Sequence, residues 1–316
     1  MTKIVVLDQD TLSRDDRDFD GIRALGDVKL FDHMPEAETI RACEGAEAIL
    51  FHKTDMTRSL ISALPDLKYI GTYATGYNNI DLEICKKRGI TVTNAPAYST
   101  DAVAQHTVSL LLMAAGNAHR YAEDIRRGQI LWDPLFPYAA YSQHEVRGKT
   151  LGIFGFGEIG AAVAKIADAL GMRVVVHSRR KPENCPYEYL SAEELFQRSD
   201  FISLHCPLTD ETRGIINERT LSMMKKTAVL INTARGGLID EDALLRALRE
   251  KRLACSCLDV VADEPIPREN KFAGLDNAII TPHIGWSPQE TRKRLFSVVA
   301  DHLRAYLSGD AQNVIV

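Results

Sequence analysis

Three glycines at positions 155, 157 and 160 form the string GFGEIG, which fits the pattern G-x-G-x-x-G. The string follows a short apolar run, TLGIF, and opens a helix-period segment, AAVAKIADALG. There the first glycine permits a tight turn, the second lets the backbone approach a pyrophosphate, and the third allows close helix–strand packing. The free N–H groups of the helix then face the phosphates. We therefore predict a dinucleotide-binding turn rather than an ordinary glycine-rich turn, with contacts from Gly155, Gly157, Glu158, Ile159 and Gly160.

The end of the next strand indicates which dinucleotide to expect. NAD-binding units usually place an acidic residue about 20 positions after the turn, where it binds the ribose hydroxyls. This sequence has Ser178, Arg179 and Arg180 there, and no carboxylate. A hydroxyl and two guanidinium groups would bind a 2′-phosphate through charge-assisted hydrogen bonds, whereas a carboxylate would repel it. We therefore expect NADP(H), with NAD(H) as the alternative if the arginines are only surface charges.

Three more strings, NTARGGLID (232–240), LDVVADEP (258–265) and TPHIGW (281–286), follow later predicted strands, at the sheet edge where doubly wound folds bind ligands. With GFGEIG, they resemble the D-isomer-specific 2-hydroxyacid dehydrogenase family in order and spacing, along essentially the whole chain. The resemblance implies a catalytic set of Arg235, Glu264 and His283.

These residue types suit the reduction of a 2-oxo acid, which needs a hydride at the carbonyl carbon and a proton at its oxygen. An imidazole titrates near working pH, so His283 can give the proton. Glu264 would bond the other ring nitrogen and fix the tautomer. Arg235 would hold the substrate carboxylate with a rigid two-pronged donor. A lone histidine is more often structural, but the two matching strings favour function here.

The resemblance also implies contacts outside the catalytic set. The loop TYATGYNNID (72–81) would offer backbone N–H groups of Ala74, Thr75 and Gly76 to the substrate carboxylate, since glycine allows close approach to an anion; a simple strand–helix turn is the alternative. Further implied cofactor contacts are Thr107, Cys206, Thr233, Ala234 and Asp259, the last toward the nicotinamide amide.

Aromatic and basic residues near these strings are further candidates for the pocket, and some of them have alternative interpretations. Trp286 is expected to line the active site. Trp132 or Phe136 could complete the pocket, even from a partner subunit, or could pack in an interface. Lys53 could reach the same cleft or be solvated.

The substrate expected from the resemblance is small. The strings ATGYNNID, APAYSTDAVAQHT and GKTLGIFGFGEIG most resemble glycerate dehydrogenases, also called hydroxypyruvate reductases. Hydroxypyruvate or glyoxylate is therefore expected, with D-lactate and 3-phosphoglycerate dehydrogenases as alternatives. The regulatory C-terminal domain of longer phosphoglycerate dehydrogenases is not expected. A dinucleotide-sensing corepressor-like binding protein is an alternative of another class.

The residues above need a framework of alternating strands and helices, which predicts an α/β fold with parallel sheets. The predicted strands are 3–8, 47–52, 67–73, 89–94, 150–157, 172–178, 200–206, 227–233, 254–260 and 277–282. A single helix is expected over 101–128. We predict two doubly wound domains: a Rossmann cofactor domain (100–288) inserted in a flavodoxin-like substrate domain (1–99 and 289–316). The two are expected to close over the substrate.

The composition is that of an ordinary soluble globular protein. A net charge of −5, from 38 Lys+Arg against 43 Asp+Glu, gives no general attraction to nucleic acid or anionic membranes. The six cysteines include no CxxC pair, so we expect reduced thiols and no metal site. The apolar run before Asp8 is too short for a signal peptide, and 109–116 is far below the roughly 20 residues that span a bilayer. We expect a cytoplasmic homodimer, because the long helix and the aromatic segment 128–149 need burial.

Overall fold

A computed structural model describes residues 1–12, 17–129, 140–181, 183 and 185–316. The chain divides into two compact units. Unit 1 comprises Met1–Ser99 and Ser287–Val316, and unit 2 comprises Thr100–Trp286. Each unit has its own sheet and core, and each is described by itself.

Unit 1 contains a five-stranded parallel sheet in the order β2-β1-β3-β4-β5. Its strands are β1 (Lys3–Val6), β2 (Asp27–Leu30), β3 (Ala48–Phe51), β4 (Tyr69–Thr72) and β5 (Thr91–Thr93). Every residue of the central strands β3 and β4 is buried, as expected for a sheet covered on both faces. This is the flavodoxin-like strand order, so the predicted fold of this part is confirmed. The edge strand β2 was not predicted, because its alternately exposed DVKL is not an apolar run.

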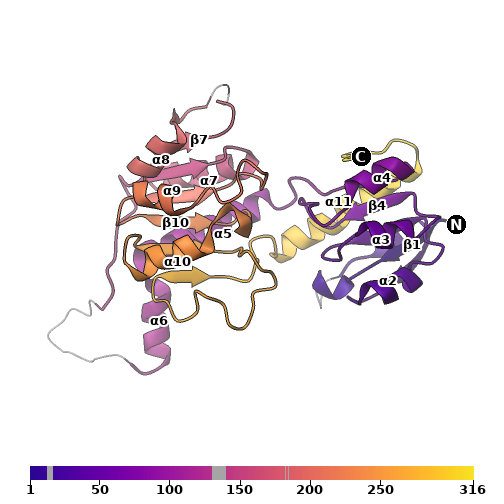
Figure 1. Ribbon diagram of the computed structural model, residues 1–316, viewed down its shortest axis with the longest axis horizontal. Coiled ribbons are helices and arrows are strands. Elements are labelled where there is room, and N and C mark those ends of the chain that lie inside the picture. Colours follow the sequence, from indigo (N-terminus) through magenta and orange to yellow (C-terminus); the bar gives the residue numbers. More distant parts are fainter. Residues whose placement is uncertain (13–16, 130–139, 182, 184) are drawn as a thin grey trace. The chain divides into compact units, whose positions relative to one another are not determined.

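Helices cover both faces of this sheet. They are α1 (Asp20–Arg23), α2 (Glu36–Ala42), α3 (Arg58–Ser62), α4 (Leu82–Arg88) and α11 (Gln289–Leu307), with the 3-10 turn η1 at Gln9–Thr11. Side chains of Thr57 and Asp81 cap α3 and α4 by accepting bonds from backbone N–H groups. The C-terminal helix α11 packs against α1 and β4, so its yellow ribbon lies among the violet elements of the first 99 residues (Figure 1).

Unit 2 contains a seven-stranded parallel sheet in the order β12-β11-β10-β9-β6-β7-β8. Its strands are β6 (Thr150–Phe154), β7 (Arg173–His177), β8 (Glu188–Tyr189), β9 (Phe201–Leu204), β10 (Val229–Asn232), β11 (Cys255–Leu258) and β12 (Ala278–Ile280). The order runs outward in both directions from β6, which is the Rossmann pattern with its switch point between β6 and β9. The predicted doubly wound fold is confirmed here too.

The helices of unit 2 form two layers around this sheet, except α6, which extends away from it and has no buried residue (Figure 1). They are α5 (Thr100–Gly116), α6 (Ala118–Arg126), α7 (Glu158–Ala169), α8 (Ala192–Arg198), α9 (Glu218–Met223) and α10 (Glu241–Arg249), with the 3-10 turn η2 at Gly236–Leu238. Alternate strand residues point to opposite faces. Leu230 packs with the residues of α8, α9 and α10, whereas Val229 and Ile231 pack with those of α5 and α7.

The single helix predicted over 101–128 is wrong. The structure has two helices, α5 and α6, separated at Asn117, whose φ is 50°. Asparagine tolerates this left-handed conformation better than most residues. Its side-chain amide also donates to the carbonyl of Ser142, at 2.8 Å. A contact 25 residues away in the chain therefore stabilises the break, and the local apolar period does not reveal it.

Candidate active site

The glycine turn lies between β6 and α7. Gly155 directly follows β6 and has a φ of 100°. A Cβ there would lie 2.4 Å from the amide nitrogen of Cys206 and 2.5 Å from the carbonyl carbon of His205. Gly160 lies in the first turn of α7, and a Cβ there would lie 2.3 Å from the carbonyl oxygen of Gly155. Close backbone packing therefore requires both glycines, whatever the turn binds.

Gly157 has no such packing reason. Its φ is −91°, and in the described part of the chain a Cβ would meet nothing within 4 Å. It is the N-cap of α7 and makes no side-chain cap, so the N–H groups of Glu158 and Ile159 have no partner within the helix. Open space over N–H groups at the positive end of a helix fits a pyrophosphate. The turn therefore fits a nicotinamide dinucleotide.

The strand that follows, β7, ends at His177, and Ser178, Arg179 and Arg180 come directly after it. The Ser178 hydroxyl donates to the backbone carbonyl of Arg180, at 2.7 Å. Both arginine side chains are exposed. The pKa of the Glu211 carboxyl is lowered mainly by the hydroxyl of Thr209 and also by the charge of Arg179. The strand end therefore presents two cations, one of them in the field of an acid from the loop after β9.

Two predicted cofactor contacts, Thr107 on α5 and Thr233 after β10, bond to each other. Their hydroxyl oxygens are 2.9 Å apart, and Thr107 also donates to the carbonyl of Val103, at 2.8 Å. Since a hydroxyl has one proton, Thr233 is the donor in the pair. The third contact, Cys206, is buried, and burial raises the pKa of its thiol to about 11. Cys206 is therefore a neutral thiol whose backbone packs on Gly155.

The register of the sheet aligns the ends of three strands. Asn232 of β10 pairs with Leu258 of β11, which pairs with Ile280 of β12. The next residues along each chain segment are Thr233, Asp259 and Thr281. Because neighbouring parallel strands lie about 4.8 Å apart, these residues form one row at the carboxyl edge of the sheet.

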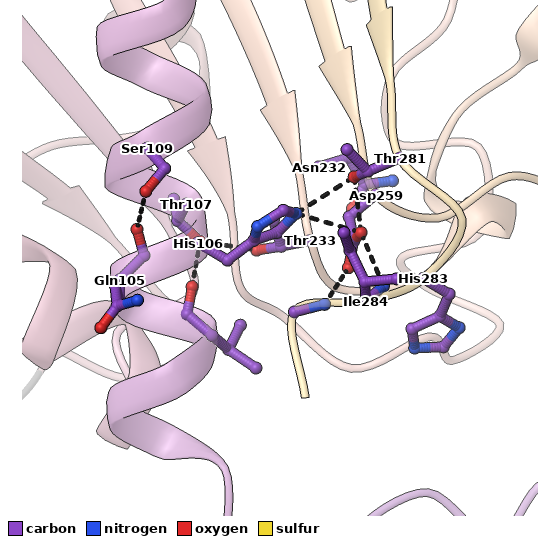
Figure 2. A network of polar contacts seen from close by, with 12 residues as sticks. Gln105, His106, Thr107, Ser109, Asn232, Thr233, Asp259, Thr281, His283 and Ile284 are labelled. Atoms are coloured by element: carbon purple, nitrogen blue, oxygen red, sulfur yellow. Dashed lines mark hydrogen bonds and ion pairs between the residues drawn. The ribbon is translucent and has the colours of Figure 1, made fainter. Parts of the chain in front are cut away.

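Asp259 is the centre of the polar network in Figure 2. Its Oδ1 accepts from the Thr281 hydroxyl at 2.6 Å, from His106 Nε2 at 3.1 Å and from the Ile284 N–H at 2.9 Å. Its Oδ2 accepts from the Gly285 N–H at 2.9 Å. Burial alone would raise the pKa of this carboxyl, but these donors outweigh burial and lower the pKa to about 2. Asp259 is therefore an ionised residue with several internal partners, and its contact with the nicotinamide stays a prediction.

His283, which follows β12, and Glu264, which follows β11, form an ion-pair geometry. Nδ1 of His283 lies 2.6 Å from Oε2 of Glu264, and both side chains are 28% exposed. The φ of His283 is 53°, an uncommon backbone conformation for a residue with a side chain. In Figure 2 the imidazole projects away from the Asp259 network. Since Nδ1 faces the carboxylate, Nε2 is the ring nitrogen left for a reacting oxygen.

Arg235 lies three residues beyond β10, at the start of η2. Its guanidinium donates to the carbonyl of Ala234 at 2.6 Å, and its own carbonyl accepts from the Asn232 amide at 2.8 Å. A Cβ on the next residue, Gly236, would lie 2.0 Å from the carbonyl of Val261. The loop that carries Arg235 is therefore packed against the loop that leads to Glu264.

In unit 1, the segment after β5 supports the predicted carboxylate loop. The Thr75 hydroxyl donates to the carbonyl of Ala95 at 2.8 Å, and the Asn94 amide donates to the carbonyl of Thr75 at 2.7 Å. The N–H of Ala95 also donates to the carbonyl of Ala74, at 2.9 Å. Gly76 follows directly in the same loop. In these contacts the loop is held by the carbonyl groups of Ala74 and Thr75 and by the Thr75 hydroxyl, and none of them uses a backbone N–H group of the loop.

The remaining predicted residues are Trp286, Lys53, Trp132 and Phe136. Trp286 is the last residue of unit 2 and is half-buried. Lys53 follows β3, and its N–H donates to the buried Asp8 carboxylate at 2.7 Å. Trp132 and Phe136 lie outside the described residues. Among the residues that the structure describes, no group of three or more His, Cys, Asp or Glu side chains could hold a metal ion.

Sequence reasoning did not find His106 or Thr281 as members of the site. Thr281 begins the string TPHIGW, so its position beside His283 was visible. His106 precedes the predicted contact Thr107, but its partner Asp259 is 153 residues away. Only the fold brings this pair together.

Comparisons with known proteins identify the relatives of this chain. The model of the D-isomer specific 2-hydroxyacid dehydrogenase NAD binding domain matches residues 108–285. A hydroxypyruvate reductase of Blautia hydrogenotrophica is 38% identical over 99% of this chain and 99% of its own length.

Two solved structures have the same fold over nearly the whole chain. An NADPH-dependent glyoxylate/hydroxypyruvate reductase of Sinorhizobium meliloti, in complex with NADP and malonate, is 26% identical with a TM-score of 0.88, and the match covers 100% of this chain and 97% of that one. A D-lactate dehydrogenase of Aquifex aeolicus, in complex with NAD and lactic acid, is 32% identical with a TM-score of 0.84, covering 99% of each chain.

Over the described residues, no helix is both long and apolar enough to cross a membrane.

The predicted family resemblance is confirmed by the family model and by the full-length relative. The chain belongs to the D-isomer specific 2-hydroxyacid dehydrogenase family, whose members are NAD(P)-dependent oxidoreductases acting on CH–OH groups.

Proposed function

We propose that this protein reduces hydroxypyruvate or glyoxylate to the corresponding 2-hydroxy acid, with NADPH as the preferred reductant. The observation that carries the proposal is the contact of 2.6 Å between His283 Nδ1 and Glu264 Oε2, in the same unit as the glycine turn. The Blautia relative bears the name hydroxypyruvate reductase, and the Sinorhizobium structure is named for both substrates.

His283 is the proton donor in this proposal. Glu264 at Nδ1 stabilises the imidazolium and fixes the ring, so that Nε2–H points to the carbonyl oxygen of the substrate. As the proton leaves Nε2, the imidazolium–carboxylate ion pair becomes a hydrogen bond from a neutral imidazole to the charged carboxylate of Glu264. When bound, the reduced nicotinamide supplies the hydride to the carbonyl carbon.

Arg235 and the loop Ala74–Gly76 keep their predicted task of binding the substrate carboxylate. A guanidinium offers two parallel N–H groups to a carboxylate, which fixes the orientation of a small 2-oxo acid. In unit 1, hydrogen bonds to the carbonyls of Ala74 and Thr75 fix two peptide planes of the loop. These contacts do not use the N–H groups of Thr75 and Gly76 on the other side of the same planes, which supports their proposed role.

The preference for NADPH rests on Ser178, Arg179 and Arg180. Two exposed cations and no carboxylate at the end of β7 favour a 2′-phosphate. A charge-assisted hydrogen bond contributes roughly 1.5–3 kcal/mol, which corresponds to a preference of about ten- to a hundredfold. The competing interpretation is that Arg179 and Arg180 are surface charges that bind no part of the cofactor.

Steady-state assays test the proposal directly. Oxidation of NADPH and of NADH is measured with hydroxypyruvate, glyoxylate, pyruvate and phosphohydroxypyruvate. We expect the highest kcat/KM with hydroxypyruvate or glyoxylate and NADPH. Preference for pyruvate or phosphohydroxypyruvate would move the assignment to the two alternative dehydrogenases, and absence of turnover on all four would favour a dinucleotide-sensing binding protein.

We also propose that the protein is a cytoplasmic homodimer whose domains are 1–99 with 289–316 and 100–288. The sequence arguments for burial of the helical and aromatic segments support the dimer. Light scattering after size exclusion tests it, and a mass equal to one chain of 35.1 kDa contradicts it.

A further inference from the structure

His106 of α5 faces the ends of β11 and β12 from the face of the sheet that α5 covers (Figure 2). Its Nε2 lies 3.1 Å from Asp259 Oδ1 and 3.1 Å from Thr281 Oγ1. The side chain is 17% exposed. The neighbouring Thr107 bonds to Thr233, so two successive residues of α5 are tied to the carboxyl edge of the sheet.

The position of the proton on His106 follows from its partner. The low pKa of Asp259 keeps this carboxylate ionised, and an ionised carboxylate only accepts hydrogen bonds. Thr281 already donates its single proton to Asp259 Oδ1, so its oxygen is an acceptor as well. His106 Nε2 therefore carries a proton and donates it to this pair of oxygens, whichever state Nδ1 has.

Asp259 in turn holds the turn that carries the catalytic histidine. Its carboxylate accepts from the N–H groups of Ile284 and Gly285, and its backbone carbonyl accepts from the N–H of His283 at 2.8 Å. A Cβ at Gly285 would lie 3.0 Å from Asp259 Oδ2 and 3.4 Å from His106 Cδ2, so the turn lies directly against both side chains. Three consecutive N–H groups are bonded to one aspartate.

The backbone of His283 needs such support. A φ of 53° is disfavoured for a residue with a side chain, and it persists only when the surroundings hold it. This conformation directs the imidazole toward Glu264. A small rotation of Asp259 would release the N–H groups of residues 284 and 285 and change the direction of the ring.

We propose that His106 is a positioning residue, which fixes Asp259 through its Nε2–H and so holds His283 in the conformation that directs its imidazole to Glu264. The proposal deepens the proposed function, because it assumes that His283 is the proton donor, but its structural part can be measured without turnover. His106 does not touch the substrate in this scheme.

The experiment compares three variants of the full chain. His106→Leu removes the donor, and His106→Gln restores it, since the side-chain amide nitrogen of glutamine is the same number of bonds from Cβ as Nε2. Gln105→Ala is the matched control, because Gln105 is the exposed neighbour on the same helix. Each variant is measured for kcat with the best 2-oxo acid, for the Kd of NADPH, and for the ¹³Cε1–¹H resonance of His283 in histidine-labelled protein without ligands, assigned with His283→Gln.

We expect His106→Leu to lower kcat by about 10- to 100-fold, because misplacing a catalytic group by about 1 Å has effects of this size. The Kd of NADPH should change less than kcat, because His106 is not itself a predicted cofactor contact, although its neighbour Thr107 and its partner Asp259 are. The His283 resonance should move or broaden in His106→Leu and return in His106→Gln, together with most of kcat. Gln105→Ala should match the wild type in all three measurements.

A merely structural imidazole predicts another pattern. It would lower the thermal stability of His106→Leu and leave kcat and the His283 resonance of the folded protein unchanged, or it would make His106→Gln as impaired as His106→Leu. Either result overturns the proposal. If His106→Leu does not fold, the other side-chain donor to Asp259, the Thr281 hydroxyl, is tested in its place. Thr281→Val removes this donor and Thr281→Ser restores it, and the two possible outcomes are the same as for His106. If the wild type reduces no 2-oxo acid, the proposed function fails, while the resonance of His283 still decides the positioning.

Discussion

Two glycines of one turn, Gly155 and Gly157, should respond in opposite ways to the same substitution. In Gly155→Ala the new methyl group would lie 2.4 Å from the Cys206 nitrogen, a backbone atom that no side-chain rotation can move. Overpacking of this kind costs about 1–3 kcal/mol, and the φ of 100° adds roughly 1–3 kcal/mol for a residue with a side chain. The expected loss of stability is about 4 kcal/mol, which lowers the Tm of a unit of this size by about 12 °C.

Gly157→Ala should leave the fold nearly intact. The added methyl group meets nothing within 4 Å among the described residues, and the φ of −91° suits alanine. Loss of glycine at an N-cap costs less than about 1 kcal/mol. The same methyl group would occupy the space over the N–H groups of α7, so a pyrophosphate there is displaced. Overpacking by about 2 kcal/mol corresponds to a Kd for NADPH that is about thirtyfold higher.

Thermal unfolding and fluorescence titration with NADPH measure both effects on the same samples. The expected result is a stable Gly157→Ala that binds NADPH weakly and an unstable Gly155→Ala. Wild-type affinity in Gly157→Ala would refute the cradle at the start of α7. A wild-type Tm in Gly155→Ala would refute the packing argument, and neither result depends on turnover.

Three further predictions concern the catalytic pair, the cofactor preference and the acid stability. His283→Ala should lower kcat by roughly 10²–10⁴-fold, because it removes the proton donor; near-normal turnover in steady-state assays contradicts the assignment. Arg179→Ala should lower the ratio of kcat/KM for NADPH over NADH by about ten- to a hundredfold, and an unchanged ratio means that this guanidinium does not bind the 2′-phosphate. The pKa of Asp259 falls from 3.8 to about 2 on folding, so its ionised form contributes about 2.5 kcal/mol above pH 4–5, and this contribution is lost as the pH falls toward 2. Urea unfolding from pH 5 downward should show this loss in the wild type and not in Asp259→Asn, and parallel pH profiles would contradict it.

The fold was predictable because its signals are local. Most strands of the two sheets are short apolar runs between turn residues, with the edge strand β2 as an exception. The glycine string specifies the β6–α7 turn by steric needs that Gly155 and Gly160 meet in the structure. Arg235, Glu264 and His283 each lie in a short sequence motif of a few positions. Such strings can be found without knowing which strands are neighbours.

The parts that could not be predicted depend on contacts distant in sequence. The break at Asn117 is stabilised by Ser142, and the apolar period continues across it. The pairing of His106 with Asp259 requires the register of β10, β11 and β12, which no single strand encodes. Local pattern therefore predicts candidate site residues such as Arg235, Glu264 and His283, whereas tertiary pairing decides which other residues support them.

Asp259 and Glu264 show how the surroundings give two carboxylates of one loop different tasks. Asp259 is 2% exposed and accepts several hydrogen bonds from fixed donors, so protonating it would set an O–H against donors on one oxygen and weaken the bonds to the other. Glu264 is 28% exposed, and its 2.6 Å contact is to an imidazole that can itself gain or lose a proton. A carboxylate that stays charged is suited to holding backbone N–H groups in place. A carboxylate whose partner changes charge is suited to stabilising that partner during proton transfer. In the proposed mechanism this difference suits Asp259 to holding the turn and Glu264 to stabilising the charged imidazole, although both residues follow the same strand, β11.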